Sequence, residues 1–175
     1  DKIVSVGMVE HVGREQLPTY FQRLYALLKP GGLLMNHGIV HAAERDKPSI
    51  LQRAAGKLWG DNAFIERYVF PDGELPTFAD VIAPAECAGF ETRDVEVLRE
   101  HYALTLQHWV QRLERAQDVA VDLVGEQTYR IWRLYMAASA FGFASGRLSL
   151  AQLLLGKKDD HGHVDIPLTR ADMYA

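Results

Sequence analysis

The sequence has a single cysteine, no long apolar run and no excess of positive charge. Because Cys87 stands alone, the chain cannot form an internal disulfide or hold a metal in a thiolate cluster. No apolar run approaches the roughly 20 residues that a membrane-spanning helix needs. The formal net charge of −4 and the lack of a basic arm argue against nucleic acid as a partner. These shortages point to an ordinary globular protein.

The length and composition are those of one domain. A chain of 175 residues, 48% hydrophobic and 24% charged, is long enough to bury a core of its own. The chain opens on Asp1 and enters an apolar stretch at once. We therefore expect a fragment that begins inside a β-sheet. Its first strand would leave an exposed edge, which would favour pairing with another chain in a homo-oligomer.

The first forty residues have the pattern of a βαβ unit. Residues 3–6 (IVSV) and 33–40 (LLMNHGIV) are short apolar runs, typical of strands buried on both faces. Between them, apolar residues fall at helical spacing until the KPGG turn at residues 29–32 ends the helix. This order predicts two parallel strands joined by a right-handed crossover. The fold class is therefore α/β.

The rest of the chain continues the alternation of helices and strands. Thr77 is expected to cap a helix that ends near Gly89, with Pro84 inside it. Leu-, Trp- and Tyr-rich patterns predict two long helices before a closing strand and a polar tail. The expected ranges are a partly helical stretch over 42–61, a third strand over 90–98, helices over 103–123 and 126–143, a closing strand over 147–155 and a tail over 157–175.

Polar residues follow the first two predicted strands. Glu10 comes after the first strand and Gly7, and His37 lies near the end of the second. Because ligands of open α/β sheets bind beyond the carboxyl ends of the strands, we expect Glu10 and His37 to share one crevice. There they could bind an anion or relay a proton. The alternative is structural: Glu10 caps the next helix, and His37 is a core histidine with satisfied hydrogen bonds.

Several segments resemble one family of enzymes. They are DKIVSVGMVEHVG, LLKPGG with a following H-x-I, FIERYVFPDGELP, HYALTLQHW, YRIWRLYMAASAFGF and GRLSLAQ. In this order, from residue 1 to about 152, they resemble the cyclopropane-fatty-acyl-phospholipid synthases and mycolic acid cyclopropane synthases. The resemblance implies the C-terminal half of a class I methyltransferase, a doubly wound sheet with a helical lid inserted before the last strand. Residues 1–156 would be this part of the catalytic domain, with the lid at about 103–143.

The resemblance also implies a chemistry. The double bond of a phospholipid acyl chain would attack the methyl group of S-adenosylmethionine, and a bound bicarbonate would remove a proton from the resulting carbocation. The positions that match the family's bicarbonate-binding residues are Glu10, His37, Ile39 and Tyr102, of which Glu10, His37 and Tyr102 would be catalytic. Gly38 stands where the family usually has threonine. Without the resemblance, Tyr102 would be interpreted as an aromatic residue of the core whose hydroxyl bonds to the backbone.

Only part of a cofactor site is present in the sequence. Gly7 is a weak candidate for contact with S-adenosylmethionine, and a Gly-rich loop after a first strand is not found. We therefore expect that the isolated chain does not bind the cofactor with useful affinity. His161 and His163 lie in the polar tail without a convincing set of further ligands, so no metal is assigned.

The resemblance further implies a lipid partner. Apolar residues of the two long helices would line a channel for acyl chains, and contact with a membrane surface would follow from such a substrate. The expected location is cytoplasmic, at the inner membrane surface. Two alternatives remain open: a small-molecule N- or C-methyltransferase in which Glu10 and His37 act directly, and a non-catalytic lipid-binding remnant.

Overall fold

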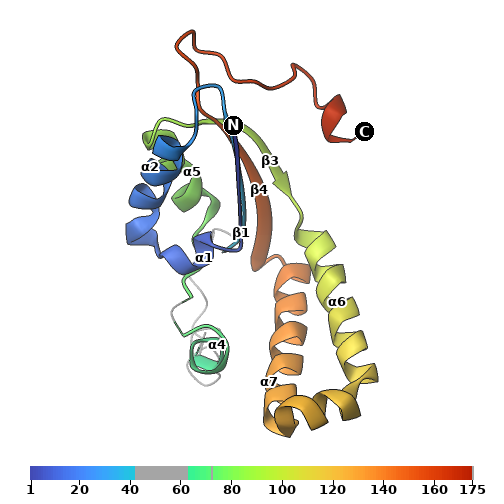
Figure 1. Cartoon of the computed structure of the whole chain (residues 1–175). Helices are drawn as coiled ribbons and strands as arrows, with labels where there is room; N and C mark the ends of the chain where they lie inside the picture. Colours follow the sequence, from blue (N-terminus) through green and yellow to red (C-terminus); the bar gives the residue numbers. More distant parts are fainter. Residues whose placement is uncertain (42–62, 72, 175) are drawn as a thin grey trace.

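The computed structural model describes residues 1–41, 63–71 and 73–174, and Figure 1 shows how they are arranged. The predicted partly helical stretch over 42–61 lies outside the described residues. A twisted sheet has helices against one face and a long helical hairpin extending from its lower end (Figure 1). The α/β class expected from the sequence is confirmed.

The sheet has four strands in the order β1-β2-β4-β3. Strands β1 (Lys2–Val6) and β2 (Leu33–His41) are parallel, as the βαβ pattern predicts, with Val6 opposite His37. Strand β4 (Leu148–Gly156) lies between β2 and β3 (Glu91–Val97) and is antiparallel to both. The last strand of the sequence therefore lies inside the sheet and pairs directly with β2.

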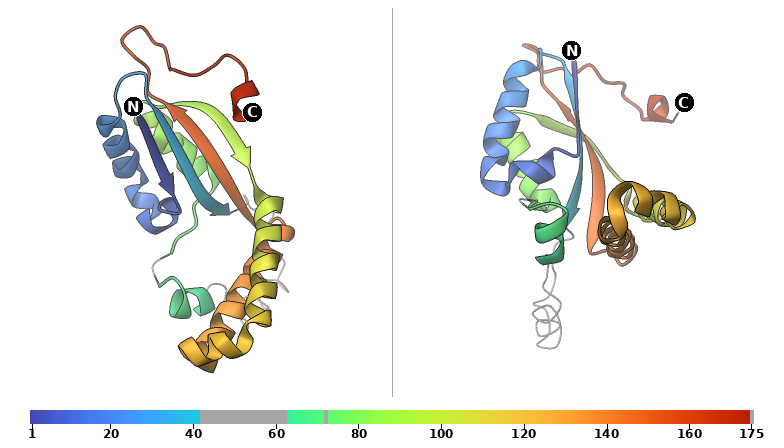
Figure 2. Two further views of the ribbon diagram at one scale, coloured as in Figure 1. Left: turned by 45° about the vertical axis from the view of Figure 1, so that its right-hand side comes forward. Right: turned by 60° about the horizontal axis from the view of Figure 1, so that its bottom comes forward.

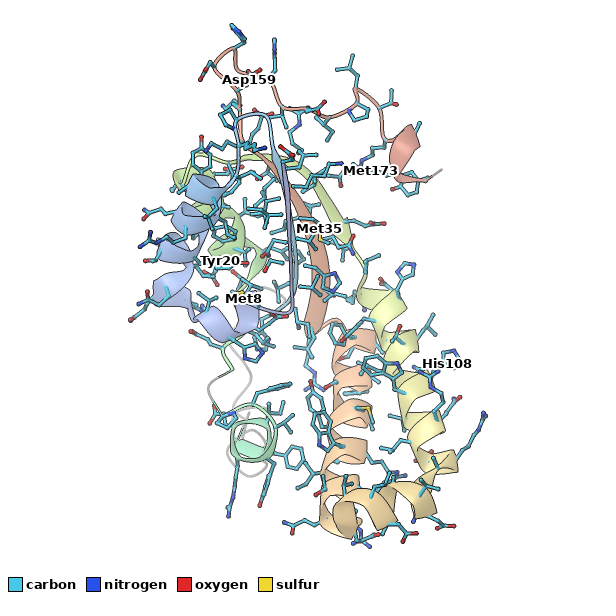
Figure 3. The ribbon with its side chains drawn as sticks, in the orientation of Figure 1. Met8, Tyr20, Met35, His108, Asp159 and Met173 are labelled. Carbon is cyan, nitrogen blue, oxygen red and sulfur yellow. The ribbon has the colours of Figure 1, made fainter. Side chains whose placement is uncertain are left out.

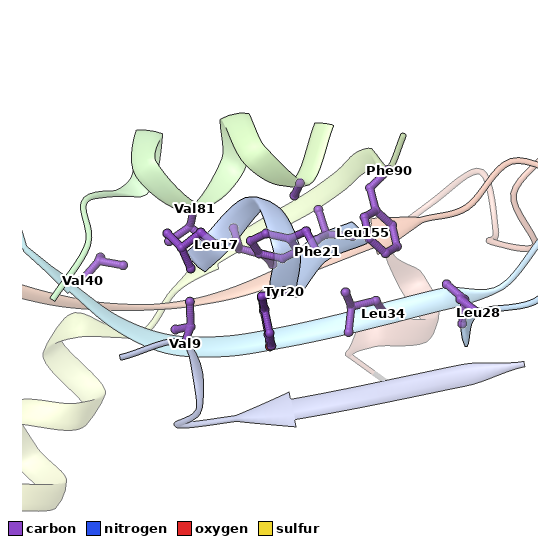
Figure 4. Packing of buried hydrophobic residues seen from close by; sticks show 12 residues of the cluster. Val9, Leu17, Tyr20, Phe21, Leu28, Leu34, Val40, Val81, Phe90 and Leu155 are labelled. Atoms are coloured by element: carbon purple, nitrogen blue, oxygen red, sulfur yellow. The ribbon is translucent and has the colours of Figure 1, made fainter. Parts of the chain in front are cut away.

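Three helices cover one face of the sheet: α1 (Val9–Val12), α2 (Leu17–Leu27) and α5 (Phe78–Cys87) (Figure 2). A short 3-10 turn over Arg14–Gln16 leads into α2. Burial of a large apolar side chain contributes about 1.5–3 kcal/mol, so the core between these helices and the sheet holds the layer in place. Its main members are Val9, Leu17, Tyr20, Phe21, Leu28, Leu34, Val81, Phe90 and Leu155 (Figure 4).

Helix α5 begins with the cap expected from the sequence. The hydroxyl of Thr77 accepts from the backbone N–H of Asp80, whose carboxylate accepts in return from the backbone N–H of Thr77. These two bonds satisfy groups that a helix start otherwise leaves unpaired. Pro84 lies within the helix, which nonetheless continues to Cys87. The backbone of Thr77 also bridges His41, which ties the end of β2 to this helix.

A helical hairpin formed by α6 (Arg99–Arg115) and α7 (Gln117–Ala144) packs on the other face of the sheet (Figure 2). The predicted boundaries were wrong here: the first helix starts four residues earlier and ends at Arg115, since Ala116 leaves the helical conformation. Helix α7 therefore includes residues 117–124 and bends at Gly125, whose φ is +81°. The Arg99 guanidinium donates to the carbonyl of Phe143 at 2.7 Å and so joins the two ends of the hairpin.

The remaining elements are short. Helix α4 (Ala63–Tyr68) precedes α5, and a 3-10 turn over Ala171–Met173 lies in the C-terminal tail. Lys157 anchors the tail to the sheet layer. Its ammonium donates to the backbone carbonyls of Tyr25 and Leu28, at the C-terminal end of α2, and lies over the ring of Tyr25. Among the described helices, none combines the length and apolarity required to cross a membrane.

Candidate functional site

Strand β1 ends at Val6, beside the middle of β2, and the chain turns there into α1. The backbone N–H of Gly7 donates to the carbonyl of His37 at 2.9 Å, just where β1 ends. Gly7 has a φ of +64°, a left-handed conformation that glycine adopts without strain. The turn at Gly7 leads directly into α1, and this short helix brings Glu10 back towards β2.

Glu10 is a buried carboxylate with one satisfied oxygen. Its side chain is 8% exposed, and its Oε1 accepts the backbone N–H of Ile39 at 2.7 Å. Its other oxygen, Oε2, is buried and has no hydrogen-bond partner among the described residues. Buried carboxylate oxygens are costly unless they accept a hydrogen bond, so Oε2 is where a donor from a ligand would be most favourable.

Tyrosines of three different helices lie near this carboxylate. Burial raises the pKa of Tyr20, of Tyr102 and of Tyr135, and in each case the negative charge of Glu10 raises the pKa further. For Tyr20 and Tyr135, hydrogen bonds with Ser5 and with Ser139 act on the pKa in the opposite direction. Both burial and the nearby charge oppose formation of a tyrosinate. The hydroxyl groups therefore stay protonated at neutral pH and can act as donors.

Tyr20 belongs to a polar network that sequence reasoning missed. Its hydroxyl lies 2.7 Å from Oγ of Ser5 and 2.9 Å from Oδ1 of Asn36. Figure 4 shows the ring directed from α2 towards β2. Ser5 and Asn36 are opposite each other in the register of β1 and β2, and Asn36 is only 1% exposed. Polar residues inside otherwise apolar strand sequences were the available signal.

The aromatic side chains of Tyr102 and Tyr135 form an apolar wall beside the hairpin. The Tyr102 ring makes an edge contact with Phe143, with ring centroids 4.9 Å apart. The Tyr135 ring contacts Phe70 and Trp132 in the same manner, at 5.8 and 5.7 Å. Such contacts hold bulky side chains in defined positions. The wall combines apolar surface with hydroxyl donors, as a pocket for a mostly apolar ligand requires.

His37 does not hydrogen-bond to Glu10. Its Nδ1 lies 3.2 Å from Nε2 of Gln152 on β4. Neighbouring residues of a strand point to opposite faces, and the Cβ position of Gly38 lies 3.6 Å from Oε1 of Glu10. His37 therefore points to the face opposite to Gly38. These contacts do not join the two residues that we expected to share a crevice: Glu10 bonds to the backbone of Ile39, whereas His37 bonds to Gln152.

The absence of a side chain at Gly38 follows from the packing of Val9. A Cβ at this position would overlap Cγ1 of Val9, which is 1% exposed and has a stiff branched side chain. The threonine that the family usually has here would not fit beside this valine. Position 38 therefore requires glycine because of its neighbour.

Gly38→Ala is expected to destabilise the protein by about 1–3 kcal/mol through overpacking. The cost should nearly vanish in a Val9→Ala background, because the overlapping methyl group is then removed. Urea unfolding of the two single variants and the double variant measures this coupling. Equal costs of Gly38→Ala in both backgrounds would show that Val9 does not restrict position 38.

The histidines of the tail lie far from Glu10. The ring centroids of His161 and His163 are 6.4 Å apart, near Asp159. Figure 3 shows Asp159 at the end of the molecule opposite to the hairpin. Within residues 1–41, 63–71 and 73–174, three or more metal-ligating side chains do not come together. Cys87 is exposed as a free thiol.

An open hollow of about 650 Å³ lies between α6 and α7, where Glu114, Tyr129 and Arg133 are among its lining residues. Its charged lining residues pair with one another: Glu114 with Arg133, and Glu126 with Arg130. Because these charges are already paired with each other, whereas one buried oxygen of Glu10 has no partner, Glu10 is the better candidate for the functional centre.

The arrangement of the sheet defines a class of protein. Its strand order, with an antiparallel last strand between β2 and β3, is that of the C-terminal half of a class I S-adenosylmethionine-dependent methyltransferase. The family described as mycolic acid cyclopropane synthetase matches residues 1–153. The chain belongs to this family, and the resemblance stated from the sequence is confirmed.

Individual relatives agree with this assignment. A probable fatty acid methyltransferase from Pseudomonas putida is 48% identical over 174 residues, which cover 99% of this chain and 42% of that protein. The cyclopropane synthase MmaA2 from Mycobacterium tuberculosis matches with a TM-score of 0.78 and 28% identity. The mycolic acid cyclopropane synthase CmaA1, complexed with SAH and CTAB, matches with a TM-score of 0.77 and 30% identity. Both structures are matched over 89% of this chain and 54% of theirs, so the chain spans about half or less of these relatives.

Proposed function

We propose that the full-length protein transfers a methylene or methyl group from S-adenosylmethionine to the double bond of an unsaturated phospholipid acyl chain. The reaction would pass through a carbocation on the acyl chain. The observation that carries the proposal is the buried Glu10 carboxylate, with one free oxygen, near the hydroxyl-bearing aromatic wall of α6 and α7. The relatives described as a probable fatty acid methyltransferase and as a cyclopropane synthase support the same substrate class.

The residues present fit a bound bicarbonate in part. Oε2 of Glu10 is a buried acceptor in need of a donor, and the O–H of bicarbonate is such a donor. Tyr102 keeps its proton and can donate to an anion. The Ile39 N–H, however, is already given to Glu10, so the anion would share this donor. When bound, S-adenosylmethionine would supply an electrophilic methyl group and bicarbonate a weak base.

The chain's own residues would act mainly by electrostatics. The backbone of Ile39 holds the Glu10 carboxylate in one orientation. A fixed negative charge in a buried site stabilises positive charge that develops nearby, because no reorganisation is needed when the reaction occurs. Besides Oε2 of Glu10 and the shared N–H of Ile39, the protonated hydroxyl of Tyr102 and the ring of His37 would be polar contacts of the anion. Gly7 would lie close to S-adenosylmethionine at the end of β1.

A lipid substrate also implies where the enzyme works. The proposal places it at the cytoplasmic surface of the inner membrane, in peripheral contact with phospholipid. At the bend between the helices, Val119, Leu123 and Val124 are 62%, 78% and 53% exposed. These side chains are suited to the lipid interface. The exposed valines of edge strand β1, Val4 and Val6, suit a contact with further protein, and a homo-oligomer remains a proposal.

Mass spectrometry of the products tests this function. The full-length protein would be incubated with S-adenosylmethionine and a monounsaturated phospholipid, with the saturated phospholipid as the matched control. We expect the unsaturated acyl chain alone to gain the mass of one CH2 group. Methylation of an amine in place of the acyl chain would favour the small-molecule methyltransferase, and lack of any product would favour the lipid-binding remnant.

A further inference from the structure

Gln152 is the side-chain partner of His37. Strand β4 runs antiparallel to β2 and places Gln152 directly opposite His37. Residues opposite each other in this way have side chains on the same face of the sheet. Nε2 of Gln152 lies 3.2 Å from Nδ1 of His37, and both side chains are half-buried. The pair therefore arises from the insertion of the last strand beside β2.

The chemistry of the pair determines where the proton of His37 lies. The nitrogen of a glutamine amide can only donate hydrogen bonds. Facing such a donor, Nδ1 of a neutral imidazole must be the acceptor, so the ring proton is on Nε2. In this tautomer His37 offers an N–H donor at Nε2. Such a ring is suited to holding an anion and cannot accept a proton at Nε2.

We propose that Gln152 is a positioning residue that fixes the Nε2–H tautomer of His37 and thereby makes this histidine an anion-holding donor. The proposal rests on the proposed function only in the identity of the anion, because the tautomer is a property of the chain itself. Glu96, opposite Gln152 on β3, is exposed, and Glu10 bonds to Ile39. The charges of Glu96 and Glu10 are unchanged in the Gln152 variants.

Two substitutions of Gln152 act on the tautomer in different directions. Gln152→Leu removes the donor at similar size, so His37 should populate both tautomers. Gln152→Glu places an acceptor beside Nδ1, which should move the proton to Nδ1. Gln111→Leu, at an exposed position of α6, is the matched control.

Nitrogen-15 NMR of the histidine rings in the full-length protein measures these states directly. The signals of His37 are identified by their loss in His37→Ala. We expect the Nε2–H tautomer in the wild type and in Gln111→Leu, a mixture in Gln152→Leu, and Nδ1–H in Gln152→Glu. Nδ1–H in the wild type, or an unchanged tautomer in Gln152→Leu, would overturn the proposal.

Turnover provides the second measurement. By analogy with the partners of metal-bound histidines, Gln152→Leu should lower kcat about 10- to 100-fold with little change in KM for phospholipid. A protein that unfolds would lose both kcat and its circular dichroism spectrum, so the spectrum is recorded in parallel. The tautomers decide whether Gln152 positions His37. The product analysis described above decides the proposed function, and the two can fail separately.

Discussion

Glu10→Gln is expected to lower kcat of the full-length protein about 100-fold, the size of effect seen when one fixed electrostatic group of an active site is removed. Glutamine has nearly the same shape and can still accept the N–H of Ile39 through its amide oxygen. It has neither the negative charge nor the free acceptor at Oε2. Because a half-satisfied buried carboxylate is costly, stability should be retained or improved.

The same variant should change the ionisation of Tyr102. The negative charge of Glu10 contributes, after burial, to raising the pKa of this phenol. Without that charge the tyrosinate is less disfavoured, so the pKa should fall towards its ordinary value while staying raised by burial. Carbon-13 NMR of labelled tyrosine follows this titration. The control is Glu15→Gln, on an exposed part of the turn before α2. Wild-type kcat in Glu10→Gln would remove this carboxylate from the mechanism.

His37→Ala should also lower kcat about 100-fold, with circular dichroism and the melting temperature nearly unchanged. The side chain is half-buried in the middle of β2 and bonds only to Gln152 among the described residues, so its loss disturbs little packing. The anion would lose one of its polar contacts. His108→Ala is the matched control, since this residue lies on the outer side of α6 (Figure 3). Equal turnover in the two variants would exclude His37 from the reaction.

The local elements could be predicted from the sequence because their signals are local. Apolar runs with a helix between them are sufficient to predict that β1 and β2 are parallel, and a threonine three residues before an aspartate predicts the cap of α5. The end of α6 at Arg115 and the start of α7 were missed, whereas the predicted gap at 124–125 coincides with the bend at Gly125. The break at Ala116 has no marker residue, and the helical pattern runs on through it into residues 117–124.

The site was only partly predictable, because its contacts depend on register and on packing between distant segments. Glu10 was named from its place after the first strand and Ile39 from the resemblance, but the hydrogen bond between them was not foreseen. The partner of His37 depends on β4 entering the sheet next to β2, which periodicity does not encode. Likewise, the relation between Gly38 and Val9 depends on how closely α1 packs on β2.

Labelled S-adenosylmethionine tests the central claim most directly. The full-length protein and its Glu10→Gln variant would be incubated with a monounsaturated phospholipid and a cofactor whose transferable methyl group carries deuterium. We predict that the wild type attaches the deuterium-bearing carbon to the former double bond of the acyl chain, and that the variant does so about 100-fold more slowly. Deuterium found on a headgroup amine, or equal rates for both proteins, would contradict the account.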